Sequence, residues 1–363
     1  MKFYENELKA LKRAQRLRSR EVVDYKLKDF ASNDYLGLAH KKELHEKASQ
    51  ALSLNAVHAP KASMLVNGYH QIHKDFESAL AEANGFEEAI VLGSGFNANI
   101  ALIEALVRKG DTLFIDELYH ASGILASQIG EMKVVVFRHN DMNHLDELCK
   151  RSSAKRKIIA VEGIYSMDGD LCDKEVFSVA DRNEALLIVD EAHSSGVVGK
   201  HLMGVFEHYE VPIRENYIKM GTLGKAYGSF GAFILSSNHI AEYLLNRAKP
   251  IIYATSLSLY DTLLAHTSLK YILSNAEDLT NEISKRRELI NSKLGIKVDG
   301  LIVPIVYDDN KRVVEIKDEL LSLGYAVGAI RQPTVQKAII RLIARLGESL
   351  DDLSNVCDIL VER

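Results

Sequence analysis

The chain has few cysteines, few prolines and no long hydrophobic run. Its three cysteines, Cys149, Cys172 and Cys357, are odd in number, far apart and without a Cys-x-x-Cys pair, which argues against a disulfide framework and a zinc site. We therefore expect a reducing, cytoplasmic compartment. No uninterrupted apolar run approaches the ~20 residues that span a bilayer. The first residues also lack the apolar core of a signal peptide. These absences predict a soluble protein outside the membrane.

An excess of basic charge is also missing. The formal net charge is −5, which gives no electrostatic reason to expect nucleic acid or an anionic membrane as a partner. The one basic segment, residues 9–20, carries a stripe of leucines and is predicted to be the solvated face of a helix. With 363 residues the chain is long for a single core, so we expect two domains.

What the sequence does have is an alternation of short β-branched runs with helical or mixed segments. Because most of these segments are long enough for crossovers, the pattern favours an α/β fold with a doubly wound, mainly parallel sheet. The last two runs are joined mostly by glycine and small residues, which leaves an antiparallel pairing open for them. The predicted strands are 89–92, 112–115, 133–137, 158–162, 186–190, 217–220 and 232–235.

On either side of this region the pattern changes. A short strand is expected within 24–30, and two strand-like runs, 301–307 and 339–343, lie near the C-terminus. The pattern predicts helices over 1–20, 41–54, 73–84, 269–294, 315–323 and 350–361. It also predicts the domains, which are an N-terminal arm over 1–35, a large domain over 36–265 and a smaller C-terminal α+β domain over 266–363.

Lys225 stands out because it lies in a glycine-flanked loop directly after a predicted buried strand. A lysine in this position is poorly placed for salt bridges, but it becomes a nucleophile when burial or nearby cations lower its pKa. Asp190, at the end of another strand, is then the natural partner for the ring nitrogen of pyridoxal 5′-phosphate (PLP). Ligands of open parallel sheets bind outside the carboxyl ends of the strands. The segments expected there are 93–96, 116–120, 162–166, 190–193 and 222–225.

Two other motifs admit alternative interpretations. Residues 93–98 follow a strand and open a helix, so their amides could cradle a phosphate. They also spell G-x-G-x-x-A, with Asp116 where a ribose-binding acid would lie, so a nicotinamide oxidoreductase is an alternative that leaves Lys225 and Asp190 unexplained. Residues 190–193 spell the DEAH box of helicases, but no G-x-x-x-x-G-K-[ST] loop accompanies them, which excludes a helicase.

Taken together, the motifs resemble those of the α-oxoamine synthases, which are PLP-dependent enzymes of fold type I. The resemblance runs over nearly the whole chain, and the motifs keep the family's order. It implies a large, mainly parallel sheet domain, a smaller C-terminal domain and a homodimer. The motifs are Ser-Asn-Asp-Tyr-Leu-Gly-Leu at 32–38, Gly-Ser-Gly-Phe-Asn-Ala-Asn at 93–99, His-Ala-Ser at 120–122, Glu-Gly-Ile-Tyr-Ser-Met-Asp-Gly-Asp at 162–170, Asp-Glu-Ala-His-Ser-Ser-Gly at 190–196, Thr-Leu-Gly-Lys at 222–225 and Tyr-Ala-Thr-Ser at 253–256.

The resemblance implies specific cofactor contacts. Lys225 would hold PLP covalently and move the α-proton of the substrate. Asp190 would pair with the ring nitrogen, His120 would stack on the ring, and His193 and Ser166 would bond its phenolic oxygen. The phosphate contacts would be the amides of Gly95 and Phe96, the side chain of Thr222, and Thr255 reaching the cofactor of the neighbouring subunit.

The resemblance also implies substrate contacts. Asn33 and Arg341 would position the substrate, with Arg341 on the amino-acid carboxylate and Arg345 as the alternative. Arg18 and Thr334 correspond to contacts with the acyl substrate. One segment departs from the family pattern: residues 58–63 carry proline and lysine where the family usually has glycines, so the acyl side of the site is where we expect a difference.

Within the family, Gly-Ser-Phe-Gly-Ala at 228–232 and Arg-Gln-Pro-Thr at 331–334 favour one activity. This is the joining of L-alanine to a pimeloyl thioester, carried by CoA or an acyl carrier protein, to give 8-amino-7-oxononanoate for biotin biosynthesis. Members that use glycine, such as glycine C-acetyltransferase, or serine share the cofactor residues and remain alternatives.

Overall fold

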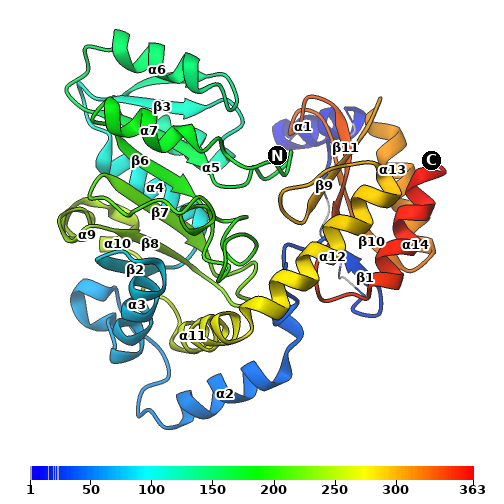
Figure 1. Ribbon diagram of the computed structural model, residues 1–363, viewed down its shortest axis with the longest axis horizontal. Coiled ribbons are helices and arrows are strands. Elements are labelled where there is room, and N and C mark those ends of the chain that lie inside the picture. Colours follow the sequence, from blue (N-terminus) through cyan, green and yellow to red (C-terminus); the bar gives the residue numbers. More distant parts are fainter. Residues whose placement is uncertain (1, 15, 19, 21, 23) are drawn as a thin grey trace.

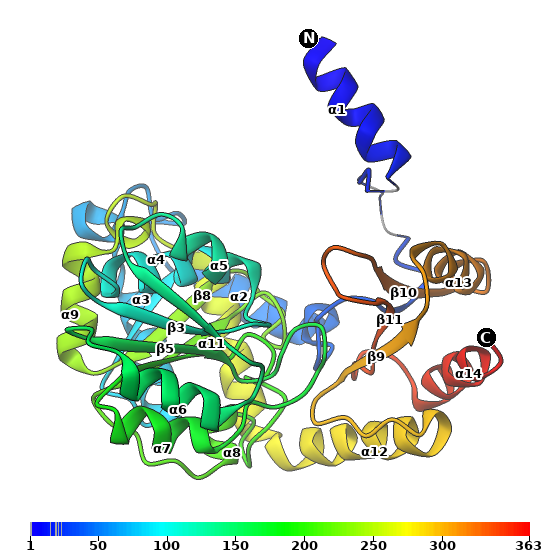
Figure 2. The same cartoon turned by 90° about the horizontal axis from the view of Figure 1, so that it is seen from above.

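The computed structural model describes every residue except 1, 15, 19, 21 and 23. The chain forms two lobes built on two separate sheets (Figure 1), and helix α1 (Lys2–Arg13) projects away from both of them (Figure 2). The two sheets correspond to the expected larger α/β and smaller α+β units. The exact domain boundaries stay predictions.

The large lobe contains a seven-stranded sheet in the order β2-β8-β7-β6-β5-β3-β4. Only β8 runs antiparallel to its neighbours, so the mainly parallel sheet and the antiparallel final pair are both confirmed. The strands are β2 (Glu88–Leu92), β3 (Thr112–Asp116), β4 (Lys133–Phe137), β5 (Lys157–Glu162), β6 (Leu186–Asp190), β7 (Tyr217–Thr222) and β8 (Ala232–Ser236).

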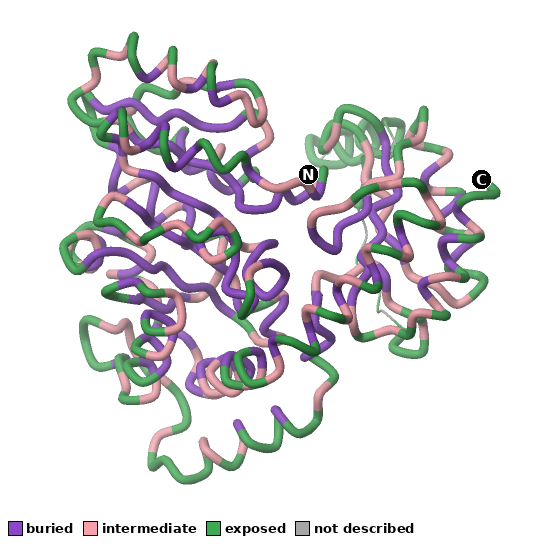
Figure 3. The backbone as a smooth tube through the Cα atoms, viewed as in Figure 1, coloured by how far each residue is buried: buried purple, intermediate pink, exposed green. Residues whose placement is uncertain are grey.

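Helices cover both faces of this sheet (Figure 1), and its central strands are almost entirely buried (Figure 3). Because successive strand side chains point to opposite faces, Val161 and Val189 join one apolar cluster while Ala160 and Ile188 join the other. The helices of this lobe are η1 (Leu38–His40), α2 (Lys42–Ser53), η2 (Met64–Gly68), α3 (Gln71–Asn84), α4 (Gly95–Leu106), α5 (Ala121–Ser127), α6 (Met142–Arg151), α7 (Glu175–Arg182), α8 (Val205–His208), α9 (Asn238–Arg247), α10 (Lys249–Ile252) and α11 (Leu259–Ser274).

The small lobe contains a four-stranded sheet in the order β1-β10-β11-β9. Its first strand comes from the N-terminal part of the chain, because β1 (Lys28–Phe30) pairs in parallel with β10 (Tyr325–Ile330). The chain then returns through residues 31–41 to the large lobe. The other elements are β9 (Ile302–Tyr307), β11 (Ala338–Ile343), α12 (Ala276–Leu294), α13 (Asn310–Ser322) and α14 (Leu350–Val361).

Three local features differ from the predictions, and the first is the helix expected over 1–20, which ends at Arg13. The single helix expected over 269–294 is two helices, since Asn275 separates α11 from α12 with φ −124° and ψ 20°. Its side-chain Nδ2 donates to the Tyr271 carbonyl at 2.8 Å, so the asparagine competes with the helical backbone pattern. Strand β10 was not predicted, because it contains Gly328 and is mostly only half-buried.

Candidate active site

Strands β5, β6 and β7 end together at one edge of the large sheet. Glu162, the last residue of β5, lies opposite Asp190, the last residue of β6, and Asp190 lies opposite Met220 of β7. The loop that joins β7 to β8 carries Lys225. The carboxyl ends of the parallel strands therefore bring Asp190 and Lys225 to the edge where ligands of such sheets bind.

Lys225 is held in a chain of polar contacts. Its Nζ lies 2.8 Å from His193 Nε2, and His193 Nδ1 lies 2.5 Å from the Tyr35 hydroxyl. Burial lowers the pKa of Lys225 to about 8, against the opposing effect of the Asp190 and Glu162 carboxylates. Burial, reinforced by the positive charge of Lys225, also lowers the pKa of His193 well below its ordinary value. A neutral imidazole therefore faces an amine that is partly neutral near pH 8.

Asp190 is buried, and both of its carboxylate oxygens are engaged. Oδ1 accepts from the Ala192 amide at 3.0 Å, and Oδ2 accepts from Asn99 Nδ2 at 2.8 Å. Asn99 is itself fixed, because its Nδ2 also donates to Ser122 Oγ at 2.9 Å and its Oδ1 accepts from the Tyr119 hydroxyl at 2.8 Å. Sequence reasoning missed Asn99, although it closes the motif at 93–99 and lies one helical turn after Gly95.

His120 precedes α5 with an exposed ring whose Nδ1 lies 2.6 Å from Ser122 Oγ. Partial burial lowers the pKa of His120, while Asp190 raises it and Lys225 lowers it further. These two effects place the imidazole within electrostatic reach of both groups. The exposed imidazole is therefore accessible to a ligand that also reaches Asp190 and Lys225.

The N-terminus of α4 provides a place for a phosphate. Ser94 caps the helix by accepting from the Asn97 amide at 3.2 Å, and Gly95 and Phe96 are the first helical residues. A Cβ built on Gly95 would lie 3.7 Å from Thr222 Cβ, so the helix start faces the end of β7. The amides of a helix N-terminus suit a phosphate group, and the Thr222 hydroxyl lies beside them while donating to the Gly231 carbonyl at 3.1 Å. The residues present therefore fit PLP.

Arg341, on β11 of the small lobe, reaches the same region. It is buried, its Nε donates to the Ser166 carbonyl at 2.8 Å, and its Nη1 donates to Asn33 Oδ1 at 3.0 Å. The Tyr35 hydroxyl also donates to Asn33 Oδ1, at 3.3 Å. Ser166 is fixed by Glu162, because the Ser166 amide donates to Glu162 Oε2 at 3.0 Å. Asn33, Ser166 and Arg341 are thus brought together, joined by Tyr35, which sequence reasoning missed although it lies in the motif at 32–38.

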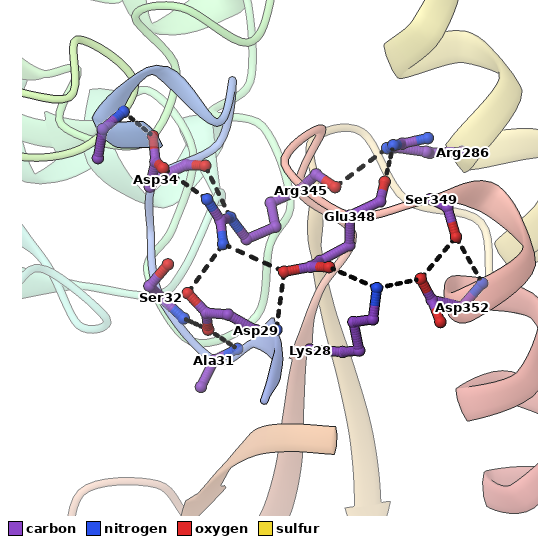
Figure 4. Close-up of polar contacts among 11 residues, drawn as sticks. Lys28, Asp29, Ala31, Ser32, Asp34, Arg286, Arg345, Glu348, Ser349 and Asp352 are labelled. Atoms are coloured by element: carbon purple, nitrogen blue, oxygen red, sulfur yellow. Dashed lines mark hydrogen bonds and ion pairs between the residues drawn. The ribbon is translucent and has the colours of Figure 1, made fainter. Parts of the chain in front are cut away.

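Arg345 lies elsewhere, in a cluster of carboxylates (Figure 4). Its Nε and Nη2 bond to the carbonyl and Oδ2 of Asp34 at 3.0 and 2.5 Å, and its Nη1 bonds to Asp29 Oδ2 at 2.9 Å. This guanidinium is occupied by acidic partners of the chain itself. The placement therefore favours Arg341 over Arg345 for a substrate carboxylate.

The remaining predicted residues are not drawn into this cluster within the described part of the chain. Arg18, Thr255 and Thr334 are exposed, and the Thr334 amide donates to the Arg331 carbonyl at 3.0 Å. Their roles stay predictions that require a ligand or a second copy of the chain.

The departing segment at 58–63 lies beside the segment that carries Thr255. The Ser256 amide donates to the Ala62 carbonyl at 3.0 Å. Lys61 has φ +70°, in the left-handed region that favours glycine. The lysine therefore occupies a backbone conformation that glycine would adopt at lower cost.

The described residues form neither a metal-binding cluster nor a membrane-spanning helix. They contain no group of three or more His, Cys, Asp or Glu placed to hold a metal ion. None of the helices formed by these residues has the length and hydropathy to cross a bilayer.

Comparison with known proteins identifies the family. The model of the family described as aminotransferase class I and II matches residues 25–360. The 8-amino-7-oxononanoate synthase of Helicobacter pylori (strain ATCC 700392 / 26695) is 42% identical over 360 residues, which cover 99% of this chain and 96% of the relative.

Solved structures agree. A structure of serine palmitoyltransferase (SPT) with a PLP internal aldimine is 25% identical to this chain, with a TM-score of 0.87. The match covers 98% of this chain and 95% of that one. The 8-amino-7-oxononanoate synthase of Francisella tularensis is 27% identical with a TM-score of 0.77, covering 93% and 98%. The nicotinamide alternative loses its support, because the family model and the relatives place the chain in a different family. The chain therefore belongs to the PLP-dependent aminotransferase class I and II family of fold type I, in its α-oxoamine synthase branch.

Proposed function

We propose that the protein joins L-alanine to a pimeloyl thioester, carried by CoA or an acyl carrier protein, and releases CO₂, free thiol and 8-amino-7-oxononanoate. The names of the relatives support this activity, with 42% identity over nearly the full length of one of them. The observation that carries it is the continuous polar chain from Lys225 through His193, Tyr35 and Asn33 to Arg341. This chain connects an amine of lowered pKa to a buried arginine that can bind a carboxylate.

Bound PLP supplies an electron sink for the electron pair that is released at the α-carbon of the amino acid. Lys225 would hold the cofactor covalently and, once displaced by the amino acid, would take and return the α-proton. Its lowered pKa suits this task, since an appreciable fraction of the amine is neutral near pH 8. Asp190 would keep a proton on the ring nitrogen, because its buried carboxylate is fixed by Asn99 and the Ala192 amide.

The other residues would orient the cofactor and the substrate. Arg341 would bind the carboxylate of the amino acid with Asn33 beside it. His120 would cover one face of the ring. His193 and Ser166 would bond the phenolic oxygen, and the α4 N-terminus with Thr222 would hold the phosphate. The acyl contacts of Arg18 and Thr334 belong to the same proposal.

A homodimer is part of this proposal. Three large apolar side chains, Phe96, Phe230 and Tyr253, are 46%, 56% and 78% exposed, and Phe96 belongs to the segment 93–96 at the cofactor edge. A second copy that covers them would bring Thr255 towards the phosphate of its partner's cofactor. We expect sedimentation analysis to give a dimer. A monomer with full activity would contradict this part.

The activity is tested by incubating the PLP-loaded protein with L-alanine, glycine or L-serine and a panel of acyl thioesters. We expect the mass of 8-amino-7-oxononanoate from L-alanine with pimeloyl-CoA or pimeloyl-carrier protein, and no product with Lys225→Ala. Turnover of glycine with acetyl-CoA in place of this pair would assign the protein to the glycine-using branch instead.

A further inference from the structure

Two segments of the chain cross in direct backbone contact between the lobes. One is the segment 29–37, which begins within β1, and the other is the turn 345–348 that follows β11. The Leu346 amide donates to the Tyr35 carbonyl at 2.8 Å. Gly37 has φ +68°, and a Cβ built on it would lie 2.7 Å from Gly347 Cα. The two backbones therefore meet at glycines, without room for side chains between them.

Arg345 cross-links this contact from the inside (Figure 4). Its side chain is 1% exposed, and it bonds to both Asp34 and Asp29 while Glu348 Oε1 lies 3.8 Å away. Taking an arginine out of water costs several kcal/mol unless its donors are paired. Here Nε, Nη1 and Nη2 all have acceptors. The buried charge of Arg345 is therefore compensated by acidic and carbonyl partners of the chain itself.

The two acids are fixed to the backbone around them. Asp29 Oδ1 accepts from the amides of Ala31 and Ser32, each at 2.9 Å, while its Oδ2 binds Arg345. Asp34 is bonded through both its carbonyl and its side chain. A single guanidinium thus bonds to both Asp29 and Asp34, at the two ends of this part of the segment.

This segment carries two residues of the candidate active site. Asn33 and Tyr35 flank Asp34 in the sequence. Asn33 Oδ1 accepts from Arg341 at 3.0 Å, and the Tyr35 hydroxyl lies 2.5 Å from His193. A shift of Asp34 would therefore move Asn33 away from Arg341. It would also move Tyr35 away from His193, which contacts Lys225.

We propose that Arg345 is a positioning residue of the amino-acid site: by holding Asp29 and Asp34 it fixes Asn33 and Tyr35 against Arg341 and His193, without contacting the substrate. The inference rests on the proposed function, because it assigns the amino-acid carboxylate to Arg341. The inference adds Arg345 to the residues that set the affinity for the amino acid, although Arg345 does not touch the amino acid. It lies in the turn 345–348 and acts on the segment that carries Asn33 and Tyr35.

The test compares Arg345→Lys with Arg287→Lys in the PLP-loaded protein. Lysine keeps the charge at 345 but has one nitrogen in place of three, so it cannot reproduce the bonds that Nε, Nη1 and Nη2 make to Asp34 and Asp29. Arg287 is a matched control, since it is a half-buried arginine of the same lobe that donates to the Gly300 carbonyl at 3.2 Å and lies outside the crossing. We expect Arg345→Lys to raise the L-alanine concentration for half-maximal change in PLP absorbance about 10-fold or more. The affinity for PLP should change less than about 2-fold, and Arg287→Lys should leave both values unaltered.

A double-variant cycle separates positioning from general destabilisation. If Arg345 acts through Asn33 and Tyr35, then Arg345→Lys should weaken amino-acid binding by less than about 2-fold in the Asn33→Ala, Tyr35→Phe background. An additive loss in that background, or an equal loss in Arg287→Lys, would overturn the proposal. Because the absorbance titration follows amino-acid binding without turnover, it gives a result even if the wild-type protein makes no 8-amino-7-oxononanoate. Absence of that product would count against the proposed function alone.

Discussion

The candidate active site has an enclosed half and an open half. In the enclosed half, Asp190, His193 and Arg341 are buried, and each has partners within the chain. In the open half, His120, Phe96 and Thr255 are exposed. The enclosed residues can be fixed before any ligand arrives, so their effects on the chemistry should be large. The open residues can act fully only when a cofactor or a second copy covers them.

Lys225→Ala is expected to have the largest effect, because it removes the covalent attachment and the proton-transfer base together. We expect kcat to fall about 10⁴-fold or more, and the protein to lose the absorbance of covalently bound PLP. Equilibrium dialysis should show that PLP still binds non-covalently through the phosphate contacts. Retention of more than a tenth of the activity would show that the enclosed half does not carry the chemistry.

Asp190→Asn should follow, with a loss of about 10²–10³-fold in kcat, because the amide cannot keep a proton on the ring nitrogen. The control is Asp116→Asn, which alters a buried carboxylate at the end of β3 that bonds to His139. That variant should lose less than about 10-fold. Equal losses in both variants would mean that Asp190 is needed for folding only.

The pH dependence of cofactor attachment sharpens the comparison further. Burial lowers the pKa of Lys225 to about 8 from the 10.5 of an ordinary lysine. Only the neutral amine reacts with the PLP aldehyde, so the attachment rate should fall about 10-fold for each pH unit below 8 and level off above it. Stopped-flow absorbance on cofactor-free protein measures this rate. A rate that keeps rising through pH 10 would mean that the lysine is not held in the enclosed half.

Thr255→Ala should have the smallest effect. We expect a loss of PLP affinity of about 10-fold or less, because one hydroxyl contact to a phosphate is removed. The loss should depend on protein concentration if the contact is made across a dimer. Activity assays over a dilution series, with dialysis to measure PLP retention, distinguish this result from a contact within one chain.

The local signals of the sequence were sufficient for the strands of the large sheet and for the placement of Lys225 and Asp190 at its edge. Buried β-branched runs end at glycine or acidic residues, and parallel pairing places those ends at one edge. The partners of these residues were not predictable in the same way. Asn99 meets Asp190 only because α4 packs against β7 and β8 of the same sheet, and Tyr35 meets His193 only because residues 31–41 lead from the small lobe to the large lobe. Such contacts depend on tertiary packing, and a local sequence pattern contains no information about which distant residues pack together.

The same limit applies to the two arginines near the C-terminus. Arg341 and Arg345 are four residues apart, and the sequence pattern left either open as the carboxylate ligand. The structure separates them, since Arg341 lies within β11 and faces Ser166, whereas Arg345 follows the strand and faces Asp34. The two arginines have different partners because of where the segment after β1 places Asn33 and Asp34. The start of that segment is fixed by the pairing of β1 with β10, which are almost 300 residues apart in the sequence.

That pairing has a consequence for folding. Strand β1, at 28–30, is aligned with residues 325–327 of β10, so the sheet of the small lobe cannot be completed until almost the entire chain has been synthesised. The large lobe has its own strands within 88–236 and can form first. Contacts of such sequence separation form slowly, because the loop between them must close before they contribute. Asn33 and Tyr35 follow β1, and we therefore expect the amino-acid side of the active site to be the last part of the protein to assemble.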